Sequence, residues 1–115
     1  MALHLTPEIL EAVYELLRVT PPFRGWKLPH ADEVRFKVGT GLFVYGQHTA
    51  CGQSDHEIML SKDRHETLPM VILTMAHEMV HMHQAQKGNR DAHGEHFRRY
   101  AAQVCRHHGF DAGAF

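Results

Sequence analysis

The first twenty residues show the hydrophobic period of an amphipathic helix. Thr6-Pro7 is typical of a helix start, because a threonine side chain can cap the first turn and a proline there loses no hydrogen bond. Pro21-Pro22 is typical of an end, because a proline disfavours helical backbone at the residue before it. We therefore expect a helix over residues 6–19, with a core-facing stripe made of Ile9, Val13, Leu16 and Leu17.

The next stretch alternates apolar and polar residues with a period of two, as in a strand that is buried on one face. Val34, Phe36 and Val38 alternate with charged residues, and residues 39–41 contain two glycines that predict a turn. Two further strands are expected over residues 42–49 and 57–61, joined by a polar loop at residues 51–55. Together they predict a short three-stranded antiparallel sheet.

Two helices are predicted after the sheet. The first covers residues 68–87, with Thr67 as its N-cap, Pro69 in its first turn and Gly88 at its end. Its first half is apolar on nearly all sides, which predicts burial at the domain centre. The second covers residues 94–108 and buries Phe97, Ala101, Val104 and Cys105 at helical spacing.

These elements predict one small α+β domain over residues 1–115. A content of 43% hydrophobic and 22% charged residues is ordinary for a globular protein. The first residues lack the basic segment of a signal peptide, and the apolar runs are too short to span a bilayer. We expect a cytoplasmic protein without a membrane partner, and Cys51 and Cys105 are expected to be reduced thiols.

The sequence His77-Glu78-Met79-Val80-His81 is an HExxH motif in the middle of the predicted central helix. At 3.6 residues per turn, His77 and His81 lie one turn apart on one face, so both rings can bind one metal ion. Glu78 then flanks the open coordination position. This arrangement is typical of a zinc metalloprotease.

A catalytic zinc ion usually has three protein ligands, and a third candidate follows shortly after the motif. His93 is the leading candidate, because the chain leaves the central helix at Gly88 and has room to fold back to the metal. His96 and Glu95 are the reserve candidates. Asp91 is close enough in sequence to accept a hydrogen bond from the second ring nitrogen of His93.

The motif HEMVH at residues 77–81 followed by HGEHF at residues 93–97 resembles the HExxH plus HGxxF pattern of SprT-like metallopeptidases, which include the Spartan DNA–protein crosslink proteases. The similarity covers roughly residues 5–110, although its specific part is the two motifs. The resemblance implies a zincin-like domain in which His77, His81 and His93 bind Zn²⁺ and Glu78 is the catalytic base. It also implies cleavage of DNA-bound or DNA-crosslinked proteins, with single-stranded DNA as the trigger.

In the predicted mechanism, Glu78 takes a proton from water and hands it to the leaving amine of a protein or peptide substrate. An edge strand beside the zinc helix would align an extended substrate, and residues 57–61 are the candidate. The candidates for stabilising the oxyanion are Tyr100, His96 and Tyr45.

Other histidines and methionines are given structural roles. His83 is two residues past His81 and should point away from the metal, while His56 and His65 are expected to be structural or solvated. The four methionines of the central helix are expected to fill the core: Met70, Met75, Met79 and Met82.

A formal net charge of −1 gives no global attraction to nucleic acid, so DNA binding would need a local basic patch. Two candidate patches exist. The first comprises residues 23–27 with Arg35 and Lys37. Its aromatic rings would suit base stacking, but Phe23 and Trp26 are equally expected to pack on the core. The second surrounds the last helix and comprises Lys87, Arg90, Arg98, Arg99 and Arg106.

Two other functions are compatible with three histidines. One is a zinc-dependent nuclease, as in the bacterial rRNA-maturation endonucleases, although these show a much closer third histidine and need no glutamate at position 78. The other is a binding module that keeps the metal without turnover. The intact Glu78 favours the peptidase over both.

Overall fold

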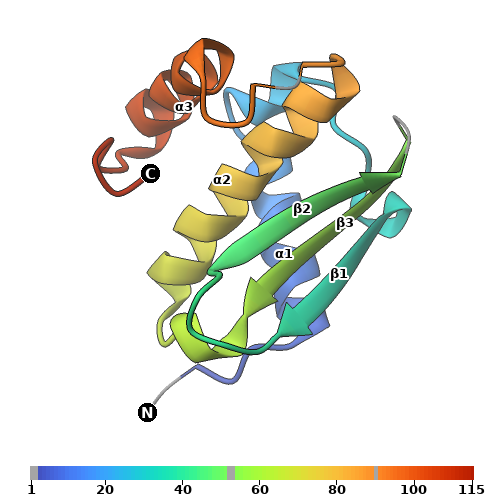
Figure 1. Ribbon diagram of the computed structural model, residues 1–115, viewed down its shortest axis with the longest axis vertical. Coiled ribbons are helices and arrows are strands. Elements are labelled where there is room, and N and C mark those ends of the chain that lie inside the picture. The colour runs from blue at the N-terminus through green and yellow to red at the C-terminus, as the bar shows by residue number, and fades with distance from the viewer. Residues whose placement is uncertain (1–2, 52–53, 90) are drawn as a thin grey trace.

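The computed structural model describes residues 3–51, 54–89 and 91–115, and it confirms the α+β class. The three α-helices and three strands follow one another along the chain as in Figure 1. The helices are α1 (Pro7–Arg18), α2 (Leu68–Gln86) and α3 (Glu95–His108), and the strands are β1 (Val34–Gly39), β2 (Gly46–Cys51) and β3 (Asp55–Ser61). Three short 3₁₀ turns connect them: η1 (Phe23–Gly25), η2 (Ala31–Glu33) and η3 (Lys62–Arg64).

The sheet is mixed, so the prediction of an antiparallel sheet is wrong. Its strand order is β1-β3-β2, with β3 parallel to β1 and antiparallel to β2. Ile58 of β3 is paired with Phe36 on one side and with His48 on the other. Residues 57–61 therefore belong to the central strand, and the edge strand beside α2 is β2.

The second strand begins at Gly46, four residues later than predicted. Residues 42–45 are apolar but form the connection that carries the chain from β1 across to the far edge of the sheet. Their side chains are exposed, and that of Phe43 is completely so. The apolar run that predicted a strand is thus a solvent-facing loop.

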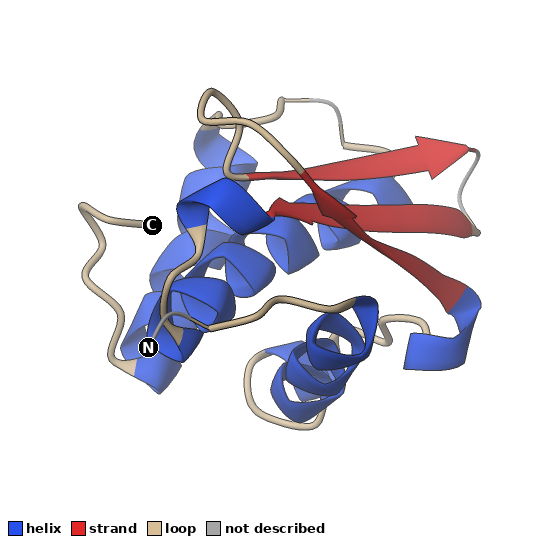
Figure 2. Ribbon diagram, turned by 90° about the horizontal axis from the view of Figure 1, so that it is seen from below, coloured by secondary structure: helices blue, strands red, loops and turns tan. Residues whose placement is uncertain are grey.

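The helices cover one face of the sheet, and the other face is open (Figure 2). The alternation in β3 fits this layering, because His56, Ile58 and Leu60 are buried while the residues between them are partly exposed. Helix α2 lies at the centre and contacts α1, α3, β2 and β3. The element that carries His77 to His81 is therefore supported on several sides.

The core confirms most of the predicted pattern and corrects two positions. Leu16 of α1 is 58% exposed, because the buried stripe of this helix is Leu10, Val13, Tyr14 and Leu17. Met75, Met79 and Met82 are fully buried as predicted, whereas Met70 is 38% exposed and does not fill the core. Cys105 is a buried free thiol.

The predicted helix ends are close to those observed. Thr6 caps α1 by accepting a hydrogen bond from the backbone N–H of Ile9 at 3.2 Å. Helix α3 ends at Gly109, whose left-handed backbone (φ 73°) is the conformation that favours glycine. In the part of the chain described, none of the helices has the length and apolar character needed to cross a membrane.

Candidate metal centre

Three histidine side chains converge at the surface of α2. His77 and His81 lie one turn apart on this helix, and His93 comes from the turn that precedes α3. The Nε2 atoms form a nearly equilateral triangle, with 3.2 Å from His81 to each of the other two and 3.3 Å from His77 to His93. The structure thus brings together the three residues that the sequence predicts as ligands.

The tautomers of two rings follow from their other nitrogens. His77 Nδ1 is 2.7 Å from the backbone oxygen of Phe115, and His81 Nδ1 is 3.0 Å from Gln84 Oε1. Because these oxygens only accept hydrogen bonds, both Nδ1 atoms carry the proton and both Nε2 atoms present a lone pair. Two lone pairs 3.2 Å apart repel each other unless a cation lies between them.

The distances fit tetrahedral zinc. Nitrogen ligands at about 2.0–2.1 Å from a tetrahedral Zn²⁺ are about 3.3–3.4 Å from each other, close to the separations of this triad. Burial lowers the pKa of His77, and it lowers the pKa of His81 to about 4. Both rings are therefore neutral near pH 7, which is the form that binds a metal.

Glu78 lies beside the triad, and its side chain is almost completely buried. Burial raises the pKa of its carboxyl group to about 7, against the opposing effect of a hydrogen bond from the backbone of His48. A carboxylate that gains and loses a proton near neutral pH suits a general base. The Glu78 carboxyl group fits here because residue 46 is a glycine. A Cβ atom at Gly46 would lie 3.2 Å from Glu78 Oε2, which is closer than most such contacts.

Two cavities of about 390 Å³ each flank the triad, and both are bordered by Gly46, His77 and Glu78. The apolar cavity lies toward the start of α2, and its other lining residues are Tyr45, His65, Met70, Leu73, Thr74, Ala114 and Phe115. The polar cavity lies toward the end of α2 and includes Gln47, His48, Gln84, Asn89 and His93. A molecule that spans both cavities would cross the three histidines.

Gln84 connects two parts of the site. Its amide oxygen faces His81, while its amide nitrogen donates to the carbonyl oxygen of Asp91 at 3.2 Å and approaches the carboxylate of the same residue at 3.4 Å. Gln84 is only 3% exposed. A single buried amide therefore orients the ring of His81 and also holds the loop that carries His93.

The structure pairs Asp91 with His96 instead of with His93 as predicted. The Asp91 Oδ2 atom lies 3.2 Å from His96 Nδ1 and 3.4 Å from the backbone nitrogen of His96. This pairing draws the reserve candidate His96 toward Asp91, whereas His93 is the residue whose Nε2 faces the other two histidines.

Of the three predicted oxyanion candidates, Tyr45 is the one that borders a cavity shared with His77 and Glu78. Tyr100 instead packs against Trp26 and His83. His83 is stacked on Trp26 with ring centroids 4.2 Å apart, so it points away from the triad as predicted. Tyr100 of α3 contacts His83 and therefore lies on the side of α2 that faces away from the triad.

The sequence pattern assigned no role at the site to Gly46 and Gln84, and it predicted a structural or solvated role for His65, of which the structure shows the structural one. Gln84 follows His81 by three positions, so helical spacing alone places it on the same face. His65 is fully buried and bonds Ser61 O through Nδ1 at 2.7 Å and Thr74 Oγ1 through Nε2 at 2.8 Å. Gly46 gave no local signal, because its role depends on the contact between β2 and α2.

The first predicted basic patch is largely engaged within the fold. Phe23 is fully buried and Trp26 is partly buried and stacked on His83, so both rings pack on the core, which is the second of the two expectations. Arg35 is paired with Asp55 and Glu57. In the second patch Arg90 lies outside the described residues, while Lys87, Arg98, Arg99 and Arg106 are exposed.

The chain matches the model of one protein family. The model of the SprT-like family matches residues 27–113, which include all of β1 to α3 and the three histidines. A search of curated proteins finds no match to the chain.

Proposed function

Because the chain belongs to the SprT-like family, we propose that it is a zinc-dependent endopeptidase with a zincin-like active site. The family is associated with metallopeptidase activity. The observation that carries the proposal is the convergence of three Nε2 atoms within 3.3 Å of one another beside the buried carboxyl group of Glu78.

His77, His81 and His93 would hold the zinc ion. When bound, the ion supplies a Lewis acid that polarises a peptide carbonyl and lowers the pKa of water. Glu78 accepts the proton of the attacking water, because burial holds its pKa near 7, and delivers that proton to the amine that leaves. Tyr45 is the candidate donor to the oxyanion from the wall of the apolar cavity.

The exposed edge of β2 would align the substrate. Strand β2 pairs with β3 on one side and forms the border of the sheet on the other, and its residues Gly46, Gln47 and His48 line the polar cavity. An extended peptide can add to such an edge through main-chain hydrogen bonds. Figure 1 shows that β2 and α2 run side by side, so this peptide would pass the three histidines.

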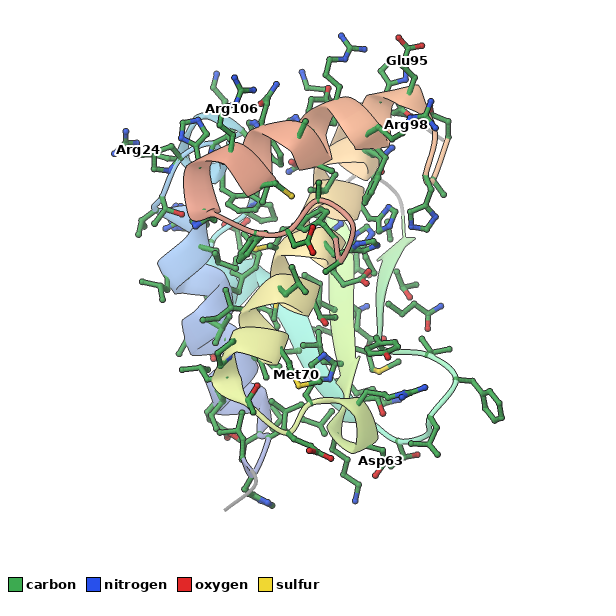
Figure 3. All side chains as sticks on the ribbon, turned by 90° about the vertical axis from the view of Figure 1, so that its left-hand side faces the viewer. Arg24, Asp63, Met70, Glu95, Arg98 and Arg106 are labelled. Carbon is green, nitrogen blue, oxygen red and sulfur yellow. The ribbon has the colours of Figure 1, made fainter. Side chains whose placement is uncertain are left out.

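DNA-bound or DNA-crosslinked proteins are our proposed substrates within this class. Figure 3 shows Arg24, Arg98 and Arg106 at the α3 end of the molecule. These side chains are exposed and form no ion pair within the described part of the chain. A surface of unpaired cations can bind phosphates through local charge although the net charge is −1.

The test is incubation of zinc-loaded protein with a DNA-binding protein, with and without single-stranded DNA, followed by gel analysis and mass spectrometry of fragments. The expected result is defined peptide fragments from the zinc-loaded chain and none after zinc is removed with a chelator. Faster cleavage with single-stranded DNA would support the crosslink-protease assignment. Cleavage of nucleic acid without cleavage of protein would overturn the peptidase in favour of a nuclease.

A further inference from the structure

The apolar cavity has a wall that offers few free polar groups. Of its polar residues, His65 uses both ring nitrogens, one on Ser61 O and one on Thr74 Oγ1. The same contact engages the Thr74 hydroxyl group. Apart from the Tyr45 hydroxyl group and the shared residues His77 and Glu78, the remaining wall is made by large apolar or aromatic side chains, namely Met70, Leu73, Phe115 and the ring of Tyr45. A polar side chain placed there would lose its water without finding partners in return.

The opposite side of the triad has a different chemistry. The polar cavity is bordered by amide and imidazole groups, including those of Gln47, His48 and Asn89. Since both cavities meet at His77 and Glu78, a bound molecule meets the side chains of Met70, Leu73 and Phe115 on one side of the reaction centre and amide and imidazole side chains on the other. The site is therefore asymmetric along the path of an extended chain.

Two residues of the cavity wall, Tyr45 and Met70, are also partly exposed, and further exposed apolar side chains are their neighbours in sequence. The loop at residues 42–45 is 49% to 100% exposed along its length, and Leu68 and Met70 at the start of α2 are 47% and 38% exposed. Figure 3 shows Met70 on this half of α2, away from the basic residues of α3. We call the exposed side chains the apolar rim: Leu42, Phe43, Val44, Tyr45, Leu68 and Met70.

The loop of the apolar rim is held in place by its backbone. Gly41 N–H donates to Asp63 Oδ2 at 2.7 Å, and the Leu42 carbonyl accepts from Arg64 Nε at 2.7 Å. The Tyr45 carbonyl accepts from Ser61 N–H at 2.9 Å, and the Arg64 guanidinium lies 4.6 Å from the centre of the Tyr45 ring. The exposed side chains are thus presented by an anchored loop, which lowers the entropy cost of binding a partner.

We propose that the apolar cavity and the apolar rim select an extended polypeptide segment with a large apolar residue next to the bond that is cleaved. This inference rests on the proposed peptidase function and names its substrate class. The occupant is the substrate itself, because the cavity is bordered by His77 and Glu78 and by the edge strand that would align a peptide. Large apolar residues are mostly buried in folded proteins, so the class is unfolded or disordered protein.

The test begins with a reduced and denatured protein digested by the zinc-loaded chain, with cleavage sites mapped by mass spectrometry. The expected result is a large apolar residue at one fixed position beside the cleaved bond. Peptides based on one mapped site are then compared with Leu or Lys at that position. One missing apolar contact changes kcat/KM about 10- to 200-fold, so the Leu peptide should be preferred at least tenfold.

The decisive variant is Met70→Asp, which places a carboxylate at the cavity wall. It should lower kcat/KM for the Leu peptide about tenfold or more and raise it for the Lys peptide. Leu16→Asp makes the same type of change at an exposed position of α1 and should alter neither value. Phe43→Ser, at a fully exposed position, should lower kcat/KM for the denatured protein about threefold or more without affecting folding.

The outcomes separate the two proposals. Cleavage without an apolar preference, or an unchanged preference in Met70→Asp, would overturn this inference and leave the peptidase intact. No cleavage of any peptide or protein by the zinc-loaded chain would overturn the proposed function and this inference with it. A purified chain that forms dimers through Phe43 and cleaves equally well after Phe43→Ser would assign the apolar rim to self-association.

Discussion

The backbone of Gly46 lies directly against the carboxylate of Glu78. A Cβ atom at Gly46 would be 3.2 Å from Glu78 Oε2, 2.8 Å from Thr74 Cγ2 and 3.1 Å from the Met59 carbonyl oxygen. Strand β2 can therefore approach α2 this closely only because residue 46 has no side chain. This close approach buries Glu78, and burial is what raises its pKa to about 7.

Gly46→Ala is expected to force β2 away from α2. Overpacking of this type costs about 1–3 kcal/mol in the free energy of unfolding, and it should also lower peptidase activity because Glu78 moves. Urea unfolding measures the stability. Gly25→Ala is the matched control, since a Cβ atom there would meet nothing within 4 Å, and it should change the stability by less than about 0.5 kcal/mol. Equal effects of the two substitutions would contradict the close approach.

His93→Ala should weaken zinc binding by more than about 100-fold. Loss of a residue that only hydrogen-bonds to a metal ligand weakens binding by about 10- to 100-fold, and loss of a ligand itself should cost more. The reason is that His93 Nε2 faces both other ligand nitrogens at 3.2–3.3 Å. Competition with a chromophoric chelator measures the affinity. His96→Ala removes only an exposed side-chain contact with Asp91, so the affinity should fall by less than about fivefold. A reversed order would make His96 the third ligand.

Gln84→Met should raise the zinc dissociation constant about 10- to 100-fold, because it removes the hydrogen bond that orients His81 and the one that holds the Asp91 loop. The same chelator competition applies, with the unfolding curve of the metal-free chain measured in parallel. Gln86→Met, two positions further along α2, is the control and should leave zinc affinity unchanged. A loss of stability in Gln84→Met without any loss of zinc affinity would show a purely structural role.

The free energy of unfolding should decrease as the pH is lowered, and the protonation of His83 should cause part of this decrease. Burial lowers the pKa of His83 to about 4 in the folded chain, against about 6.5 in an unfolded chain. The unfolded state therefore binds more protons between these values, and stability that is full above pH 6.5 is lost as the pH falls toward 4. His83→Phe should flatten this dependence. The difference between the two unfolding curves at each pH isolates His83, because zinc loss and other histidines affect both proteins alike.

At pH 7, the same substitution should cost little stability. His83 Nδ1 is buried and lacks a hydrogen-bond partner within the described residues, and a phenyl ring can keep the packing against Trp26 and Tyr100. Replacing an unsatisfied polar group with an apolar one is close to neutral or stabilising. A large loss of stability at pH 7 would mean that His83 makes a polar contact that the structure does not show.

The sequence predicted correctly those features that depend on residues close together in the chain. The ends of α2 and α3, the burial of Met75 and Met79, and the meeting of His77, His81 and His93 all follow from helical spacing and a turn of suitable length. The order and direction of the paired strands could not be predicted from the sequence pattern. Alternation tells which side chains share a face, but β3 acquires its central place through the crossing loop that joins β1 to β2.

The errors at individual residues also arise from contacts between segments that are distant in the sequence. The run at residues 42–45 is as apolar as a buried strand, yet it lies outside the core because the neighbouring turn η3 anchors its backbone. The pattern around Phe23 allowed either base stacking or packing on the core, and the contacts of the folded chain bury it fully. Gly46 and Gln84 act through contacts between different elements, so their roles become visible only in the folded chain.

The most direct test of the peptidase account compares zinc content and peptide cleavage in the native chain and in Glu78→Gln. Glu78 is not a member of the triad, and glutamine keeps the size of its side chain but cannot accept the proton. Both proteins should hold the same amount of zinc, and the variant should cleave the peptide at least about a hundredfold more slowly than the native chain. Equal cleavage by the two zinc-loaded proteins would contradict the peptidase account.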